Sequence, residues 1–231
     1  MKKISYLFAL LLVASIIFTS CRDDNDDESD NPIGIGSPTP ITDPGVLIGA
    51  INGVPIRWAT RNVNVPGTFA TRPEDAGRLF QWGTLSGETH HFDNTTPGTI
   101  DGWNRFSRNR VAWIHDPCPR GWRLPTFEEF VALLQAGYSE WTQRNGVYGV
   151  YFGVGRNRIF MPAAGSRGHQ DGNLLSVTRA GVYWSSTERD SLFPHPVWGN
   201  EQAETLSFFS GRSGILSEHF SSGFSIRCVA E

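Results

Sequence analysis

Two short segments carry side chains that could bind a metal ion. His90-His91-x-Asp93 offers imidazole and carboxylate groups, which are common zinc ligands, but adjacent side chains in an extended segment point to opposite faces. Trp198-Gly199-Asn200-Glu201 offers an amide and a carboxylate, whereas calcium takes about six to eight oxygen ligands. Polar surface loops explain both segments better, so we expect neither a metal nor another cofactor.

The sequence also lacks the familiar catalytic patterns. It contains no HExxH pair, no Gly-x-Ser-x-Gly elbow, no phosphate-binding glycine loop and no dinucleotide fingerprint. Each of these patterns would place a nucleophile, a base or a phosphate cradle at a defined point of a strand or helix. We therefore expect a protein that is not an enzyme.

Cys21 is the next chemical candidate, because it ends a segment typical of export. Lys2 and Lys3 precede an apolar stretch, Tyr6–Phe18, that is shorter than the roughly 20 residues needed to span a bilayer. Phe18-Thr19-Ser20-Cys21 resembles a bacterial lipoprotein box, in which the cysteine receives lipid such as palmitate and becomes the first mature residue. An ordinary signal peptide with an incidental cysteine is the alternative.

The lipoprotein interpretation divides the chain into a signal peptide over residues 1–20, a tether over 21–45 and a domain over 46–231. The tether begins with an acidic run and continues with Pro, Gly, Ser and Thr, a composition that cannot form a core. Acids after the lipidated cysteine resemble the surface-export signal of Bacteroidetes-type lipoproteins, although they could simply keep the tether soluble. We expect a membrane anchor through Cys21, and a location at the outer membrane with the domain on the cell surface.

Composition argues against one class of partner. The chain has 20 Lys and Arg residues and 23 Asp and Glu residues, which gives a net charge of -3. The arginines are dispersed among acids and form no basic cluster, so we expect no nucleic-acid binding. The length beyond the tether suits a single hydrophobic core.

Cysteine counting predicts a disulfide. Assigning Cys21 to lipid leaves Cys118 and Cys228, an even pair that can oxidise outside the cytoplasm. Two buried free thiols are the alternative.

Local patterns predict the elements that must position these residues. Thr126 suits a helix N-cap and Glu129 completes a capping box, after which apolar residues recur at helical spacing until Gly137. Asn52-Gly53 between apolar runs predicts a two-residue hairpin turn. Further strands are expected over Arg78–Trp82, Val147–Val154, Arg158–Met161, Val182–Trp184, Thr205–Phe209 and Phe224–Val229.

These patterns define a fold class. The chain from Gly83 to Trp113 is polar and irregular, which predicts a long loop. Long helices do not alternate with strands, so a doubly wound parallel sheet is not expected. The sequence therefore predicts an α+β domain with a twisted, mostly antiparallel sheet, few helices and long loops.

Four segments together resemble one family: Gly77–Gly83, Asp116–Thr126, Tyr183–Glu188 and Gly223–Val229. Their order is similar to that of the Fibrobacter succinogenes major paralogous domain, a domain of surface lipoproteins. The resemblance implies a C-type-lectin-like fold, with one cysteine before the helix and its partner on the final strand. It implies no particular activity, because this fold hosts binding proteins and enzymes of many kinds.

The segment Arg123–Phe130 also resembles a block of the formylglycine-generating enzymes. Those enzymes need a reactive cysteine pair that binds copper, whereas Cys118 and Cys228 sit where the structural bridge belongs. Helix capping by Thr126 and Glu129 explains the shared block better than catalysis does.

Tryptophans are the remaining candidates for a binding role. Trp122 and Trp184 belong to the family segments and are expected in the core, whereas Trp103, Trp141 and Trp198 lie in polar, loop-like surroundings. Exposed aromatic rings stack on sugars or anchor protein interfaces, although partial burial against loops is the alternative.

The sequence therefore favours a non-catalytic, surface-anchored domain that binds glycan or protein through the loops 83–113 and 188–204. Aromatic residues in irregular segments support this hypothesis, because binding residues concentrate on loops over a rigid scaffold. A structural component of a surface fibre is the second hypothesis. Asp190-Ser191-Leu192 also resembles a short O-glycosylation site of exported Bacteroidetes proteins.

Overall fold

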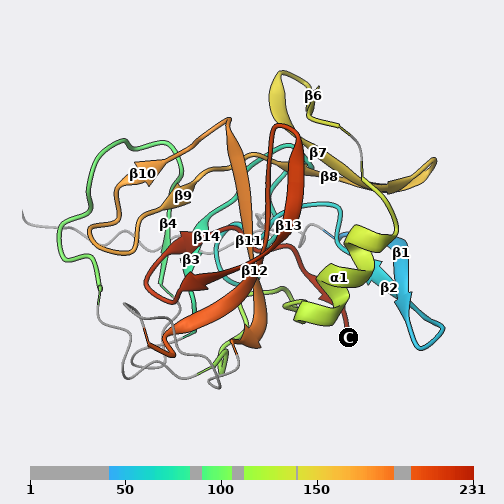
Figure 1. Ribbon diagram of the computed structural model, residues 1–231, viewed down its shortest axis with the longest axis horizontal. Coiled ribbons are helices and arrows are strands. Elements are labelled where there is room, and N and C mark those ends of the chain that lie inside the picture. The colour runs from blue at the N-terminus through green and yellow to red at the C-terminus, as the bar shows by residue number, and fades with distance from the viewer. Residues whose placement is uncertain (1–41, 84–89, 106–111, 139, 190–198) are drawn as a thin grey trace, which may run out of the picture. The chain divides into compact units, whose positions relative to one another are not determined.

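The computed structural model describes residues 42–83, 90–105, 112–138, 140–189 and 199–231 (Figure 1). The predicted signal peptide, Cys21 and the predicted tether as far as Ile41 lie outside these ranges. The described residues form one helix, α1 (Phe127–Gln135), and four sheets. The strands are β1 (Val46–Ile51), β2 (Val54–Trp58), β3 (Leu79–Gln81), β4 (His91–Phe92), β5 (Trp122–Arg123), β6 (Thr142–Arg144), β7 (Val147–Val154), β8 (Asn157–Pro162), β9 (Ser166–Arg167), β10 (Leu174–Leu175), β11 (Ala180–Glu188), β12 (Gln202–Phe209), β13 (Arg212–His219), β14 (Gly223–Phe224) and β15 (Val229–Ala230).

The four sheets have the orders β1-β2-β15-β5, β10-β9-β14-β3-β4, β11-β12-β13 and β6-β7-β8. Neighbouring strands in all of them are antiparallel. This arrangement, with one helix and long connections among the described residues, confirms the α+β class and the mostly antiparallel sheets. No helix of the described part is long and apolar enough to cross a membrane.

The helix begins and ends where its sequence pattern predicts. The Thr126 hydroxyl accepts a hydrogen bond from the Glu129 N–H, and the Glu129 carboxylate accepts one from the Thr126 N–H, which completes the capping box. Arg123 adds a bidentate ion pair with Glu129 at 2.7 and 2.8 Å. Phe130, on the buried face, stacks on Trp58 of β2 with ring centroids 5.6 Å apart, so the capped helix packs against the first sheet.

The predicted Asn52-Gly53 hairpin is also confirmed. Asn52 has φ 52° and Gly53 has φ 80°, the two positive values that a type I′ turn requires. The turn joins β1 to β2 in the expected antiparallel pair.

The prediction of one strand over Phe224–Val229 is wrong. The segment divides into β14, which pairs with β3 and β9, and β15, which pairs with β2 and β5. Between them the chain passes from one sheet to the other, and Ile226 O accepts a hydrogen bond from the Val63 N–H instead of a ladder partner. A continuous strand could not serve both sheets, which is the physical reason for the break.

The strands β11 and β12 extend beyond the predicted Val182–Trp184 and Thr205–Phe209, and β13 was not expected. These three long strands form one sheet, whose inner face packs on the core. Gly181 of β11 lies directly against Phe208 of β12, because a Cβ at Gly181 would meet the Phe208 ring at 2.2 Å. Only glycine therefore fits at this point of the sheet.

Cys118 and Cys228 are bonded, with an S–S distance of 2.06 Å and Cα atoms 6.1 Å apart. The Cα separation lies within the usual disulfide range of about 4.4 to 6.8 Å. Both sulfurs are buried in the cluster that also contains Trp82 and Trp184. The bridge joins the segment before β5 to the segment before β15, and the disulfide prediction is confirmed.

The side chain of Arg227, next to Cys228, is completely buried and pairs with no carboxylate of the described residues. Its Nε and Nη2 donate to Asn62 Oδ1 at 2.9 and 2.7 Å, while Nη1 and Nη2 donate to the carbonyls of Ala59 and Phe160. Asn62 in turn donates to the Tyr183 hydroxyl, which donates to Pro162 O. Asn62, Tyr183 and Arg227, here called the Arg227 centre, thus form a closed network of hydrogen bonds.

Asp43 fixes the start of the described chain. Its buried carboxylate accepts hydrogen bonds from the backbone and hydroxyl of Thr60 and from Arg61 Nε, at 2.8 to 3.1 Å. Arg61 Nη2 also donates to Thr42 O. These contacts attach the entering chain to the end of β2.

Candidate functional site

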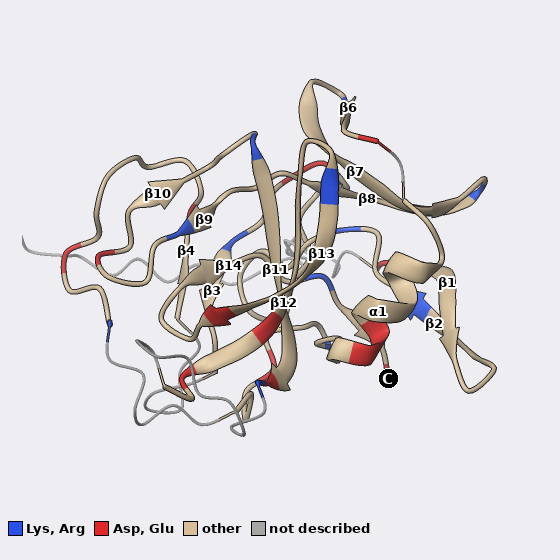
Figure 2. Ribbon diagram, viewed as in Figure 1, with Lys and Arg blue, Asp and Glu red and all other residues tan. Residues whose placement is uncertain are grey.

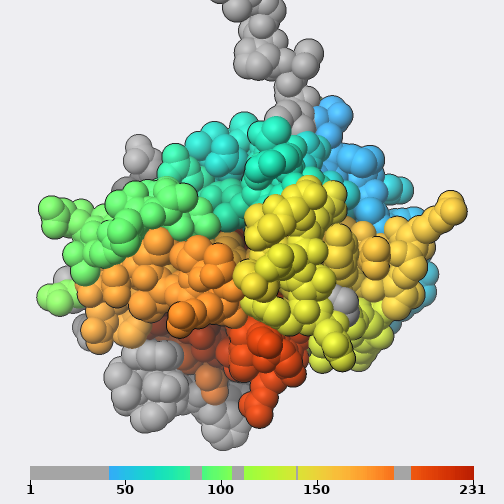
Figure 3. Space-filling model, turned by 90° about the horizontal axis from the view of Figure 1, so that it is seen from above, coloured from blue at the N-terminus to red at the C-terminus, as the bar shows by residue number. Residues whose placement is uncertain are grey.

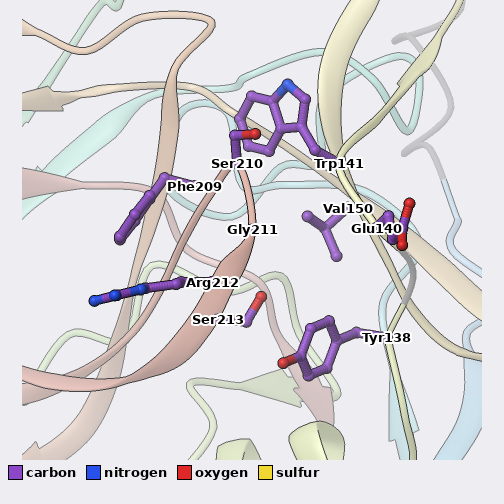
Figure 4. Close-up of a pocket in the computed structure, with 9 residues that line it drawn as sticks. All are labelled: Tyr138, Glu140, Trp141, Val150, Phe209, Ser210, Gly211, Arg212 and Ser213. Carbon is purple, nitrogen blue, oxygen red and sulfur yellow. The ribbon is translucent and has the colours of Figure 1, made fainter.

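An open pocket of about 470 Å³ lies between the β12–β13 turn and the residues that follow α1 (Figure 4). Its volume falls within the range of about 300 to 1,000 Å³ that is usual for small-molecule sites. Figure 3 shows the red atoms of the turn region beside the yellow atoms of β6 and β7. The pocket is lined by Tyr138, Glu140, Trp141, Val150, Phe209, Ser210, Gly211, Arg212 and Ser213.

The helix stop places Tyr138 at the pocket. Gly137 ends the helix with φ 96°, and its carbonyl accepts a hydrogen bond from the Gly153 N–H at 2.7 Å, which turns the chain toward β7. The Tyr138 ring then contacts the buried Phe152 ring, with centroids 6.0 Å apart, and stays 48% exposed. One edge of the ring is therefore supported by the core while the rest is available to a ligand.

Trp141 is held by the hairpin that follows it. Its indole ring stacks on the Tyr148 ring of β7, with centroids 6.0 Å apart and planes 19° apart. The β6–β7 turn is fixed in turn, because Asn145 Nδ2 donates to Glu74 Oε1 at 2.6 Å and Arg144 forms an ion pair with the same carboxylate. Trp141 is thus a half-buried ring on a braced hairpin.

The opposite wall comes from the alternation of side chains along β12. Phe208 is buried and packs on Phe152 and Tyr183, whereas Phe209 is 45% exposed. Phe209 pairs with Arg212 across the two-residue turn, in which Gly211 has φ 86°. The turn therefore presents a ring, a cation and the Ser210 hydroxyl at one edge of the pocket.

The arrangement suits a ligand that has both apolar faces and hydroxyl groups. In Figure 4, Trp141 and Tyr138 lie at opposite ends, and Val150 and Ser213 lie between them. The rings and Val150 offer apolar surface, while Glu140, Ser213 and the Tyr138 hydroxyl offer hydrogen bonds. Sugars meet this combination, because their C–H faces stack on aromatic rings and their hydroxyls need acceptors and donors.

A second, larger groove of about 650 Å³ lies along the β1–β2 hairpin and β15. Its walls are mainly aliphatic, with Leu47 43% and Val54 67% exposed. The charged side chains Arg123 and Glu129, which reach this groove, already bond each other. No aromatic ring of the described residues lines the groove, and this ion pair is satisfied within the chain. The groove is therefore a weaker candidate for a small polar ligand.

The three tryptophans proposed from sequence as binding residues do not lie at one site. Trp141 lines the pocket. Trp103 instead packs in the long loop: its indole N–H donates to His169 O at 3.1 Å and its ring contacts Phe92 at 4.6 Å. Trp198, like the segment Asp190-Ser191-Leu192, lies outside the described residues.

The histidine segment contributes hydrogen bonds and ring contacts to the long loop. Asp93 accepts hydrogen bonds from the N–H groups of Thr96 and Thr95, and these bonds hold the pKa of its carboxyl well below the usual value. Burial lowers the pKa of His91, whose ring lies 5.7 Å from that of Phe80. Within the described ranges, no three His, Cys, Asp or Glu side chains are placed to hold a metal ion.

Glu201, from the second segment considered for a cation, contacts a side chain of β13. The Glu201 carboxylate faces the His219 ring, with Nε2 and Oε2 3.5 Å apart. The His219 Nδ1 accepts a hydrogen bond from the Ser221 N–H, so its Nε2 carries a proton toward Glu201. This pair ties the start of β12 to the end of β13.

Sequence reasoning missed Tyr138, Phe209 and Arg212. An aromatic residue directly after the glycine stop of a helix was one available signal. The other was the Ser210-Gly211 turn flanked by an aromatic ring and a cation. No family model, curated protein or solved structure matches this chain.

Proposed function

We propose that this chain is a non-catalytic recognition protein, anchored by lipid at Cys21 to the outer membrane and exposed on the cell surface, whose pocket binds a glycan. The observation that carries the proposal is the pocket itself. Tyr138 and Phe209 are about half exposed beside Trp141, and hydroxyl and charged groups lie between these rings. Such a surface offers both the stacking and the hydrogen bonds that a sugar ring uses.

The proposal includes membership in the Fibrobacter succinogenes major paralogous domain family, with its C-type-lectin-like fold. Two observations support it. The segment Asp116–Thr126 leads from one cysteine into the capped helix, and the bridge returns to Cys228, directly before the final strand β15. These positions are close to those that the family resemblance implies, although Cys228 precedes the final strand instead of lying on it.

Glycan binding can be tested by substituting the pocket rings. We expect wild-type protein to bind a defined subset of a glycan array, and Trp141→Ala to lose most of that binding because the stacking surface is gone. Leu216→Ala is a control on the same β12–β13 hairpin, since Leu216 is 50% exposed and does not line the pocket. Trp103→Ala tests the loop region that the sequence suggested.

Two results would count against the proposal. A folded wild-type protein that binds no glycan would contradict it directly. Loss of binding in Trp103→Ala but not in Trp141→Ala would move the site to the long loop. Circular dichroism and thermal unfolding of each variant would show that lost binding is not lost folding.

A structural or assembly role is the second candidate function. The exposed aliphatic residues Leu47 and Val54 on the β1–β2 hairpin favour it, because exposed apolar patches mark protein contacts. A photo-crosslinker placed at Val54 in intact cells would capture one constant partner if this role is right. A crosslinker at Val154, which is 69% exposed on the β7–β8 hairpin, provides the control.

A further inference from the structure

We propose that the glycan bound in this pocket is acidic, that Arg212 binds its carboxylate or sulfate group, and that Arg179 adds positive charge at the same end of the sheet. This inference rests on the proposed glycan function and specifies the chemical class of the ligand. It starts from the distribution of charge along the β11-β12-β13 sheet, which the proposed function alone does not explain.

The two ends of this sheet carry opposite charges. The register pairs Ala180 with Phe209 and Phe209 with Arg212, so Arg179, one residue before β11, lies at the same end as Arg212. At the other end, Glu188 and Glu218 both pair with Ala203. Figure 2 shows the same separation, with blue at one end of β11 and β13 and red toward the other end of the sheet.

The cationic end is the end at the pocket. Arg212 lines the pocket, and both Arg179 and Arg212 are exposed. Neither arginine forms an ion pair with a carboxylate of the described residues. In contrast, Arg61, Arg72, Arg123, Arg144 and Arg167 each have a carboxylate partner.

Arg212 therefore offers an exposed positive charge at the edge of the pocket, which attracts an anionic ligand before it makes contact. Exposed guanidinium groups without partners are suited to carboxylate and sulfate oxygens, because their planar donors can form two parallel hydrogen bonds.

Glu140 sets the orientation of the ligand. It lines the pocket beside Val150, on the side of Tyr138, whereas the Arg212 side chain in Figure 4 extends from the turn away from Tyr138. An acid group near Glu140 would be repelled, and the sugar hydroxyls would be accepted there. A sugar ring between Trp141 and Tyr138 would thus direct its acidic substituent toward the turn.

The experiment compares oligosaccharides that differ only in charge. Uronic-acid oligosaccharides are matched with their methyl esters, and sulfated oligosaccharides with their unsulfated forms, so that the two sources of negative charge are distinguished. We expect wild-type protein to bind one acidic series about fivefold more tightly than its neutral partner in low salt. The preference should shrink as the ionic strength rises above about 0.1 M, because exposed ion pairs are screened.

Two arginine variants complete the test. Arg212→Gln should remove most of the preference for acidic over neutral ligands. The double variant that also carries Arg179→Gln should remove the rest. Arg156→Gln is the matched control, because Arg156 is exposed in the β7–β8 turn and does not line the pocket. It should keep the wild-type preference.

The outcomes separate this inference from the proposed function. Equal binding of acidic and neutral partners by wild-type protein would overturn the inference and leave glycan recognition standing. The same would follow if Arg212→Gln and Arg156→Gln reduced the preference equally. Binding of neither member of any pair would overturn both proposals.

Discussion

The Arg227 centre and the aromatic pocket use similar side chains in opposite ways. Both combine a guanidinium group, a tyrosine hydroxyl and aromatic rings. In the Arg227 centre, Arg227 and Tyr183 are fully buried and donate to Asn62, Ala59, Phe160 and Pro162. In the pocket, Tyr138 and Phe209 are about half exposed and Arg212 has no carboxylate partner among the described residues.

This difference indicates that the Arg227 centre contributes to stability, whereas the pocket is available for binding. A buried polar group without a partner costs about 1 to 3 kcal/mol, so the Arg227 centre must be complete within the chain. Burial lowers the pKa of Arg227 and raises the pKa of Tyr183 to about 12. The pocket groups stay in contact with water, so they can exchange water for a ligand without unfolding the protein.

The largest expected effect concerns Cys228, the neighbour of Arg227. Cys228→Ser removes a bridge that closes a loop of 110 residues. The chain-entropy model assigns about 4.7 kcal/mol to a loop of this length, so we expect a loss of several kcal/mol in the free energy of unfolding. Denaturant titration measures the loss, and reduced wild-type protein should match the variant. Labelling of both Cys118 and Cys228 by alkylation of unreduced protein would contradict the bridge.

Phe208 and Phe209 allow a buried ring and an exposed pocket ring to be compared within one strand, β12. Phe208→Ala should cost about 3 to 5 kcal/mol, because a fully buried ring between Phe152 and Tyr183 is lost. Phe209→Ala should change the free energy of unfolding by less than about 1 kcal/mol but weaken glycan binding. Thermal unfolding and glycan titration of both variants check this. Equal destabilisation would mean that the pocket ring is part of the core.

Arg227→Met tests whether the buried network must be complete. Asn62 Oδ1 would lose two donors and remain buried, so we expect a loss of about 2 to 3 kcal/mol. Chemical unfolding measures it, with the exposed Arg156→Met as the matched control near zero. A variant as stable as wild type would show that apolar packing can replace the network.

The sequence predicts the elements that short-range chemistry determines. The start of the helix follows from Thr126 and Glu129, because each side chain accepts a hydrogen bond from the backbone N–H of the other. The first hairpin follows from Asn52-Gly53. The bridge between Cys118 and Cys228 followed from cysteine counting, although a count gives no geometry. None of these predictions needs knowledge of distant contacts.

The break in the final strand and the pocket could not be predicted in this way. Residues 226–228 belong to no strand because the chain passes there from one sheet to the other, and neither sheet can be deduced from the segment alone. Tyr138 and Phe209 line the same pocket only because α1 and the β12–β13 hairpin pack on the same core. The polar sequence around Trp103 made it a plausible binding residue. In the structure, however, its indole N–H bonds to His169 O and its ring packs on Phe92.

The Asp43 contacts have a mechanical consequence. Because its carboxylate is bonded to Thr60 and Arg61, tension on the chain before Thr42 is transmitted to the end of β2 rather than first to β1. At that end, Trp58 pairs with Val229 of β15, so the load is shared by a sheet that contains both the early and the late strands of the domain. A protein held against flow by the chain that precedes Thr42 would therefore resist peeling of its first hairpin until the Asp43 contacts fail.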